Sequence, residues 1–293
     1  SSPTHWPDWN LLISKYFKSK FYYLTAYERD KIIGICPIHE SRYKSGLKRV
    51  YSGQFYTIPY GGWIFNRPVK IKKRDLFVQP NISIQCFSLP EIKEFGVHYD
   101  NKLQNPQSKA TLMINLTKSL DQIWSDDLNS KRKQNIRKAY KNGIKVYHEV
   151  DCDIDAFYAF YKKYNFKESD ALLPQKFINE LLLHRQKIRF RVFWAYYNKN
   201  PISNLTVAYD KDLSLYLFGN NNKEISMGQA ELLQWEAIKY MKSMGCAYYD
   251  LCYIEPKRLP GIYRFKKGFS RDEYKVNLIN VKPLPFKVMN KIL

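Results

Sequence analysis

Hydrophobic positions follow both helical and strand periods along the chain, which predicts a mixed α/β protein. In the first part, residues 7–17 have apolar positions at helical spacing behind a proline, which is typical of a helix. Residues 21–27 and 31–39 are expected to be two strands around a short turn. Further strands are expected at 81–89 and 109–116, with a Gly-rich bend at 58–63.

From residue 120 onward the pattern is clearer. A helix at 120–128 is followed by a strongly basic helix that is expected to be capped by Ser130. It ends at Asn142 and Gly143, a pair suited to a left-handed helix end. The expected order is then strand, two helices, three strands, helix, strand, helix and strand, at 144–150, 154–166, 174–186, 189–197, 202–209, 213–218, 227–243, 247–251, 259–267 and 274–281.

The charge is unusually positive, with 48 Lys and Arg against 27 Asp and Glu and a net charge of +21. Residues 1–129 carry 18 basic and 11 acidic residues, and the remainder carries 30 and 16, so the two parts have charges of +7 and +14. The electrostatic field of a protein with this positive charge attracts nucleic acid, anionic lipid headgroups or phosphorylated small molecules. A generally Lys-rich composition is the alternative explanation of the total.

Several classes of protein are not expected. The five cysteines and five histidines show no zinc spacing, and the apolar runs are shorter than the roughly 20 residues of a membrane span. No leader opens the chain, so a cytoplasmic location and reduced thiols are expected. There is no G-x-S-x-G, P-loop or H-E-x-x-H motif, so direct attack by an acceptor is the simplest mechanism for any group transfer.

Three stretches, taken in order, resemble the FemABX-type transferases. They are SKRKQNIRKAYKNGIKV, which contains the basic helix, GQAELLQWEAIKYMKSMGCAYYDL, and GIYRFKKGFS. The element order from Gly143 onward is also that of a GNAT acyltransferase domain. The resemblance extends over residues 5–280.

The resemblance implies an α/β fold of two fused GNAT-like domains, with mixed sheets flanked by helices and without the coiled-coil arm of some members. It implies a degenerate N-terminal domain at 1–129 and a C-terminal domain at 130–293. Known members move an aminoacyl group from aminoacyl-tRNA to an amine of a peptidoglycan precursor. Related sequences in polysaccharide gene clusters are regarded as N-acyltransferases, so acyl-CoA or another thioester, acting on an amino sugar or polysaccharide precursor, is the alternative.

The basic helix supplies the first candidate site residues. Its cations repel one another at a spacing of four residues, which favours either full solvation or contact with an anion. Arginine adds a bidentate geometry suited to phosphate. The candidates for phosphate contact are Arg132, Lys133, Arg137, Lys138 and Lys141.

A second basic segment runs from 257 to 271 without an acidic residue. Arg258 and Arg264 are candidates for phosphate contact there. The resemblance implies that Phe265 and Lys266 line the reaction centre, where Lys266 would stabilise the oxyanion formed when an amine attacks an ester or thioester. A surface lysine on a short helix is the structural alternative.

Two further residues have both a functional and a structural interpretation. Gly228 lies at the start of the long helix, where GNAT domains that bind acyl-CoA hold its pyrophosphate, but Ile225 stands in place of the usual Gln or Arg. Ordinary packing also explains a small residue there. Asp250, at the end of a strand, is a candidate general base and equally a turn residue.

Three hypotheses follow for function. The first is a FemABX-like aminoacyltransferase, the second is a thioester-dependent N-acyltransferase, and the third is a non-catalytic basic module that binds nucleic acid. Under both enzyme hypotheses the expected partner is a phosphorylated cell-wall or sugar-nucleotide precursor. The positive charge also suits contact with an anionic membrane surface. No bound cofactor and no metal are expected.

Overall fold

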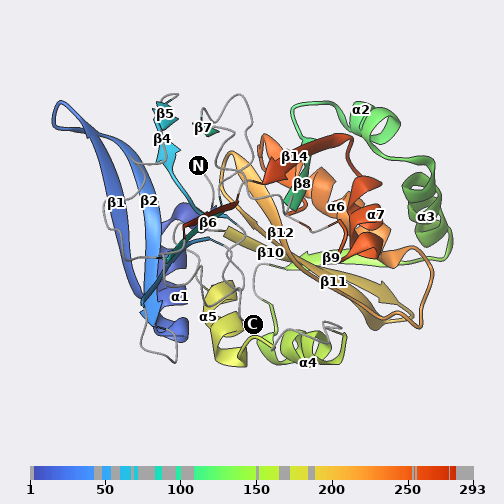
Figure 1. Ribbon diagram of the computed structural model, residues 1–293. Helices are drawn as coiled ribbons and strands as arrows, with labels where there is room; N and C mark the ends of the chain where they lie inside the picture. Colours follow the sequence, from blue (N-terminus) through green and yellow to red (C-terminus); the bar gives the residue numbers. More distant parts are fainter. Residues whose placement is uncertain are drawn as a thin grey trace. The chain divides into compact units, whose positions relative to one another are not determined.

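The computed structural model describes residues 3–42, 48–53, 60–66, 69–71, 83–87, 97–99, 109–149, 152–164, 172–183, 189–252, 254, 256–276 and 278–281 (Figure 1). The chain forms two compact units. Unit 1 comprises Ser1–Asp8 and Leu112–Glu273, and unit 2 comprises Trp9–Thr111 and Tyr274–Leu293. The expected boundary after residue 129 lies inside unit 1, and the two domains at 1–129 and 130–293 stay a prediction.

Unit 1 is built on a seven-stranded mixed sheet in the order β14-β8-β13-β12-β11-β10-β9. Neighbouring strands pair antiparallel from β9 to β12 and between β13 and β8, whereas β12 and β13 pair in parallel. The strands are β8 (Lys109–Asn115), β9 (Lys145–Glu149), β10 (Arg189–Tyr197), β11 (Asn200–Tyr209), β12 (Leu213–Asn221), β13 (Tyr248–Asp250) and β14 (Asp272–Val276).

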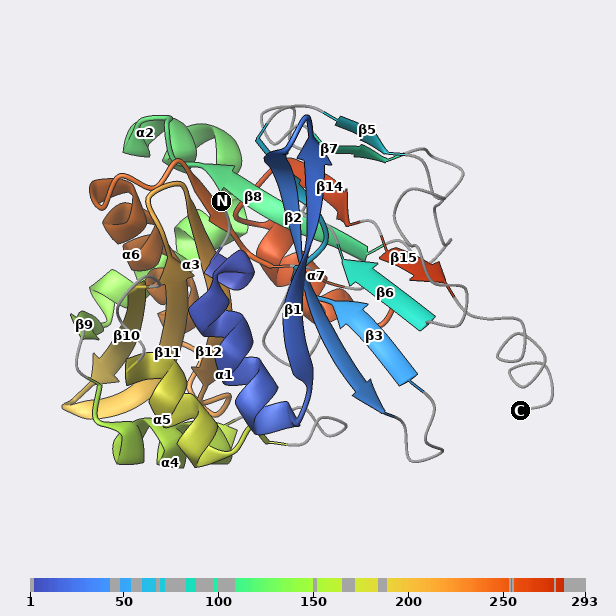
Figure 2. The same cartoon turned by 90° about the vertical axis from the view of Figure 1, so that its left-hand side faces the viewer.

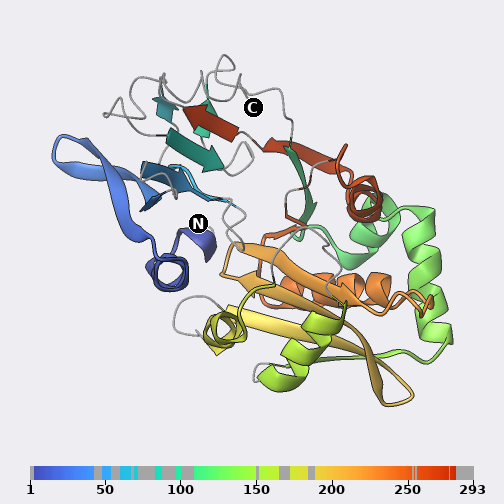
Figure 3. The same cartoon turned by 60° about the horizontal axis from the view of Figure 1, so that its bottom comes forward.

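Helices cover both faces of this sheet. The helical segments of unit 1 are η1 (Pro3–His5), α2 (Leu120–Gln122), η4 (Ile123–Asp127), α3 (Ser130–Lys141), α4 (Ile154–Tyr164), α5 (Gln175–Leu183), α6 (Gln229–Ser243) and α7 (Pro260–Lys267). α6 packs on β10 and β11 and shares a core with Leu205 and Val207, whereas α4 contacts β12 on the opposite face (Figure 3). Because side chains alternate along a strand, the neighbours of these core residues on β11 face α4.

Unit 2 contains a second sheet, in the order β1-β2-β3-β6-β15 with β4 beside β2, and a separate parallel pair of β5 and β7 (Figure 2). β1 and β2 form a long antiparallel hairpin. The elements are α1 (Pro7–Phe17), β1 (Lys20–Glu28), β2 (Lys31–Arg42), β3 (Lys48–Ser52), β4 (Ile64–Phe65), β5 (Val69–Ile71), β6 (Ser83–Phe87), β7 (Val97–Tyr99) and β15 (Leu278–Val281).

Most expected elements are present, and three differ in detail. Asn129, not Ser130, caps the basic helix, because its side chain accepts the N–H of Arg132 at 3.0 Å. The helix expected at 120–128 is one turn of α-helix followed by a π-helical turn. The last strand, expected at 274–281, divides into β14 and β15, which belong to different sheets. Ile58 and Pro59 of the expected bend lie outside the described residues.

The sheets and their flanking helices confirm the expected α/β class. Within the described residues the longest helix is α6, with 15 residues, and that part of the chain contains no coiled-coil arm. No helix among the described residues is long and apolar enough to cross a membrane.

A buried histidine ties α1 to the sheet of unit 2. His39 Nε2 lies 2.9 Å from Asn10 Oδ1, and its Nδ1 lies 3.0 Å from Ser19 Oγ. The ring also stacks on Tyr51, with centroids 5.4 Å apart. A neutral imidazole satisfies both contacts, donating to the amide oxygen and accepting from the hydroxyl. Burial lowers the pKa of His39 from its ordinary value of 6.5 to about 4.

This histidine predicts a loss of stability in mild acid. In the unfolded chain His39 binds a proton near pH 6.5, but in the folded protein only near pH 4, so its contribution is complete above pH 6.5 and lost as the pH falls. The free energy of unfolding at pH 4 should fall by about 3 kcal/mol from this group alone. Urea unfolding of the wild type and of His39→Gln at several pH values measures the difference. Identical pH profiles would contradict the assignment.

Candidate functional site

Two parallel strands of unit 1 separate at their carboxyl ends. β12 and β13 pair only from Leu213 to Leu215. Beyond this point β12 stays with β11, whereas the chain after β13 stays with β8, because Leu251 N–H donates to the carbonyl of Leu112 at 2.9 Å. The register of β11 and β12 also shifts here, which makes Leu217 the extra residue of a β-bulge. Ligands of open α/β sheets commonly bind where strand ends separate in this way.

The side chain of Lys266 lies at this separation. Lys266 is on α7 and is only 7% exposed. Its Nζ donates to the carbonyl of Cys252, just after β13, at 3.1 Å. The same ammonium lies 5.5 Å from the ring centre of Tyr216 on β12. Lys266 therefore bridges the two diverging strands, and it is not the surface lysine of the structural alternative.

The backbone beside Lys266 is held by Asp250. Asp250 is fully buried, and its Oδ1 accepts the N–H of Cys252 at 2.7 Å. Cys252 has a left-handed φ of 60°, which turns the chain out of the strand. Burial, then the charge of Asp250, raises the pKa of the Cys252 thiol well above its usual value, against the opposing effect of Lys266. The geometry gives Asp250 a structural role at the turn, and its action as a general base stays a prediction.

Phe265, next to Lys266 on α7, contacts Arg132 of α3. Its ring lies 4.7 Å from the guanidinium of Arg132 and 5.3 Å from the ring of Phe269. Arg132 Nη2 also donates to the backbone carbonyl of Arg264 at 3.4 Å. The two basic segments, remote in sequence, therefore meet where α3 packs against α7.

Arg132 also forms an ion pair inside the protein. Its Nη1 donates to Glu231 Oε1 on α6, and the same oxygen accepts the Asn135 side-chain N–H at 2.7 Å. Only 13% of the Arg132 side chain and 11% of the Glu231 side chain are exposed. Gly268 lies so close that a Cβ there would meet Arg132 Nε at 2.6 Å. Arg132 thus joins α3, α6 and α7, and its contact with a phosphate stays a prediction.

The other cations of α3 have separate surroundings. Lys133 Nζ donates to the carbonyl of Ser125 at 2.8 Å, and the Arg137 guanidinium lies 5.5 Å from the Trp124 ring centre. Lys138 Nζ donates to the carbonyl of Ser226 at 2.6 Å. Lys141 is exposed, as are Arg258 in the turn before α7 and Arg264 on α7 itself. The exposed cations lie at the surface of unit 1, where a phosphate can reach them.

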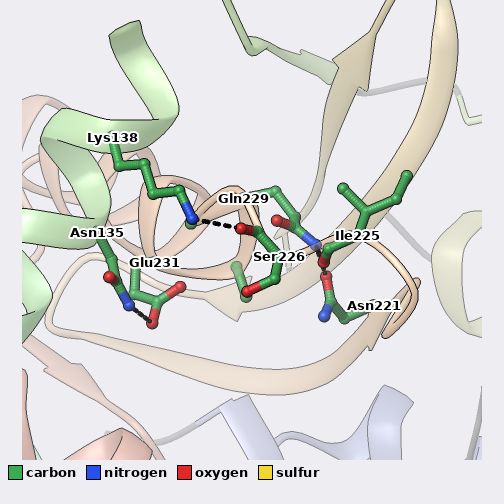
Figure 4. A pocket seen from close by; sticks show the side chains of 9 residues that line it. Asn135, Lys138, Asn221, Ile225, Ser226, Gln229 and Glu231 are labelled. Carbon is green, nitrogen blue, oxygen red and sulfur yellow. Dashed lines mark hydrogen bonds between the residues drawn. The ribbon is translucent and has the colours of Figure 1, made fainter. Parts of the chain in front are cut away.

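A hollow of about 120 Å³ lies at the N-terminus of α6 (Figure 4). Its polar groups already bond to one another. The Met227 N–H donates to Gln229 Oε1 at 3.0 Å, and Gln229 Nε2 donates to Asn221 Oδ1 at 3.0 Å. The hollow is lined by Asn135, Lys138, Asn221, Ile225, Ser226, Gly228, Gln229, Ala230 and Glu231. A carboxylate on this wall opposes a diphosphate there.

Gly228 has a packing reason of its own. It caps α6 with a φ of 83°, and a Cβ at this position would lie 2.1 Å from the backbone oxygen of Asn135 on α3. Only glycine allows both the left-handed conformation and this approach. The packing explanation is therefore sufficient, and a role of Gly228 in binding phosphate stays a prediction.

No sequence pattern pointed to Tyr216, Cys252 or Glu231 as site residues. These residues matter because they contact Lys266 or Arg132, and each contact joins parts of the chain that are distant in sequence. No motif marks such a contact. Among the described residues, no group of three His, Cys, Asp or Glu side chains lies close enough together to hold a metal ion.

Comparison with known proteins finds one matching domain family and several similar folds. Residues 130–267 match the acetyltransferase (GNAT) domain. No curated protein matches the chain in sequence. The structure of FemX matches with a TM-score of 0.69 and 11% identity, over 99% of this chain and 94% of that one.

Two other solved structures have the same fold. L-PGS from Bacillus licheniformis matches with a TM-score of 0.55 and 9% identity, over 92% of this chain and 87% of that one. A tandem GNAT protein from the clavulanic acid biosynthesis pathway gives 0.52 and 8%, over 89% and 82%. At such low sequence identity these structural matches show that the fold is shared, and nothing about function.

Residues 130–267 thus match a GNAT acyltransferase domain, and the whole described fold is GNAT-like. Over nearly the whole chain this fold is similar to that of FemX, in agreement with the resemblance of the three sequence stretches. The predicted fold class and enzyme class are both confirmed.

Proposed function

We propose that this protein transfers an aminoacyl group from aminoacyl-tRNA to an amine of a peptidoglycan precursor. The observation that carries the proposal is Lys266, whose ammonium lies between the diverging ends of β12 and β13. The resemblance to FemABX-type transferases supplies the substrate classes. The net charge of +21 supports polyanionic substrates, because both tRNA and a precursor diphosphate need a cationic surface.

In the proposed reaction the acceptor amine attacks the ester carbonyl carbon of the aminoacyl-tRNA. A C–N bond forms, the carbonyl oxygen takes negative charge, and the Lys266 ammonium stabilises this oxyanion. The ester C–O bond then breaks, and the terminal ribose leaves as a hydroxyl after taking the proton that the amine loses. This route needs no protein base, which suits the burial of Asp250 and its hydrogen bond to Cys252.

The alternative donor is an acyl-CoA or another thioester, with an amino sugar or polysaccharide precursor as acceptor. The hollow at the N-terminus of α6 favours it, since a helix N-terminus attracts a diphosphate. Three features of that hollow favour the tRNA ester instead. Glu231 places a carboxylate on its wall, Met227 N–H is already bonded, and Lys138 is bonded to a carbonyl.

The exposed cations of α3 offer a test of the proposed donor. Arg137→Glu with Lys141→Glu should weaken binding of aminoacyl-tRNA at least tenfold at about 0.1 M salt, because each reversed charge removes a phosphate contact. The slope of log affinity against log salt should become shallower by about 2. Filter binding over a series of salt concentrations measures both quantities.

The matched control reverses two exposed lysines on the other face of the sheet, Lys162 on α4 and Lys176 on α5. It changes the net charge by the same amount, and we expect it to leave the affinity and the slope nearly unchanged. If both double variants weaken tRNA binding equally, the cations of α3 contribute only through the net charge of the protein. If the protein binds acetyl-CoA tightly and tRNA does not displace it, the thioester alternative is favoured.

A further inference from the structure

A half-buried arginine on β10 lies beside α6 without an anionic partner. The guanidinium of Arg191 lies 4.8 Å from the ring centre of Tyr240, and its Nε is buried without a hydrogen bond. Among the residues that the structure describes, no carboxylate forms an ion pair with Arg191. A cation that is partly removed from water is destabilising unless an anion meets it, so this guanidinium is suited to an anionic ligand.

Ordinary structural roles do not account for this cation. The last turn of α6 attracts positive charge, but its carbonyls already accept the backbone N–H groups of residues 244–246. Glu236, one turn earlier on α6, pairs with Lys239 at 2.8 Å and accepts the hydroxyl of Tyr140. The Asp210 carboxylate, at the end of β11, accepts two backbone N–H groups of its own turn at 2.8 Å. Neither a helix cap nor an ion pair therefore explains the arginine.

Further cationic and aromatic side chains lie around Arg191. His148 on the edge strand β9 is exposed, and its ring centroid lies 4.4 Å from that of Tyr240. Arg189 is two residues from Arg191 on β10 and therefore on the same face of the sheet. It is exposed, and its guanidinium lies 5.2 Å from the ring centre of Tyr209. We call Arg189, Arg191, His148 and Tyr240 the β10 patch.

Contacts along α6 connect the β10 patch to the basic helix. Lys239, next to Tyr240, lies 3.4 Å from the hydroxyl of Tyr140 near the end of α3. The Tyr140 ring is 49% exposed, and Lys141 beside it is also exposed. Positive charge therefore continues at the surface from α3, past α6, to the edge strands of the sheet.

A row of cations interspersed with aromatic rings fits a nucleic acid. Phosphates recur along a nucleic-acid backbone, and exposed rings can stack on its unpaired bases. A lipid bilayer fits less well, because none of the four residues of the β10 patch is an aliphatic side chain that could enter it. The geometry of the arginine also suits a phosphate, since its planar fork can donate two parallel hydrogen bonds.

We propose that the β10 patch binds the phosphate backbone of the tRNA, with the Nη groups of Arg191 as one contact and Arg189 as a second. The inference rests on the proposed function and adds to it a second tRNA surface, separate from the cations of α3. Stacking on Tyr240 holds the Arg191 guanidinium in place before the RNA binds, so less conformational entropy is lost on binding.

The test neutralises both arginines, in Arg189→Gln with Arg191→Gln. Filter binding of aminoacyl-tRNA to the full chain should show an affinity about tenfold weaker at about 0.1 M salt. The slope of log affinity against log salt should become shallower by about 1.5. The matched control, Lys162→Gln with Lys176→Gln, removes the same charge from the other face of the sheet and should change neither quantity. Arg191→Lys with Arg189 intact keeps the charge without the fork and should lose part of the affinity.

Urea unfolding shows whether the double variant keeps its fold. If it does not, Arg189→Gln alone, at an exposed position, should give about half the change in slope. Equal tRNA affinity in wild type and variant would overturn the inference and leave the proposed function standing. Failure of wild type to bind tRNA would overturn both. Sedimentation with vesicles of phosphatidylglycerol and phosphatidylcholine tests the other polyanionic surface. Vesicle binding that is lost in the variant while tRNA binding is unchanged would overturn the inference in favour of a membrane contact.

Discussion

Lys266→Met should lower the turnover number by roughly 100- to 1,000-fold while leaving the protein folded, because one preorganised donor to an oxyanion contributes about 3–4 kcal/mol. Methionine is unbranched and only one atom shorter than lysine, so it fills most of the same space while removing the charge and the hydrogen bond. Lys266 is buried against the Tyr216 ring and the Cys252 carbonyl, so an apolar replacement fits its surroundings. Steady-state kinetics with both substrates saturating measures the loss.

The neighbouring lysine provides the control. Lys267 is about two-fifths exposed and pairs with Glu273 at 2.8 Å, so it has the same charge on the same helix without reaching the strand ends. Lys267→Met should keep nearly full turnover. If both variants retain activity, or both lose it together with their fold, Lys266 has no specific part in the chemistry.

Arg132→Ala should reduce the free energy of unfolding by about 3–5 kcal/mol, because it leaves the carboxylate of Glu231 buried without its ionic partner. The same substitution removes the guanidinium that packs on Phe265 and Phe269. Urea unfolding measures the change. Lys131→Ala, an exposed cation next to it on α3, should change stability by less than about 0.5 kcal/mol.

A double-mutant cycle shows whether the pair itself is responsible. Arg132→Met with Glu231→Gln removes both charges, and the double variant should be more stable than the sum of the single losses predicts. Strict additivity would mean that Arg132 acts only through its packing. The cycle also separates stability from binding, since a loss of tRNA affinity in the stable double variant would give Arg132 a phosphate contact as well.

Local patterns in the sequence predicted those parts of the fold that depend on local chemistry. The apolar spacing of 7–17 and the basic stretch that forms α3 each define a helix by neighbouring residues. Lys266 was identified by its motif. Its surroundings were not, because Tyr216 and Cys252 come from other elements of the chain.

Long-range pairing explains what the sequence left open. Arg132 belongs to a segment that resembles a phosphate-binding helix, yet its partner Glu231 lies 99 residues further along the chain. A charge pattern along one helix cannot distinguish a cation that faces solvent from one that is paired internally. Similarly, residues 274–281 look like one continuous strand in the sequence, and only pairing shows that β14 and β15 belong to different sheets.

The most direct test of the account is a single-turnover experiment with the whole chain. Protein in excess is mixed with aminoacyl-tRNA labelled in the amino acid and with a lysine-containing peptidoglycan precursor, and the fate of the label is followed. We expect the label to move into a new amide of the precursor with wild type, and this transfer to be at least 100-fold slower with Lys266→Met. Label that stays on the tRNA with wild type, while the same precursor is acylated from acetyl-CoA, would contradict the account.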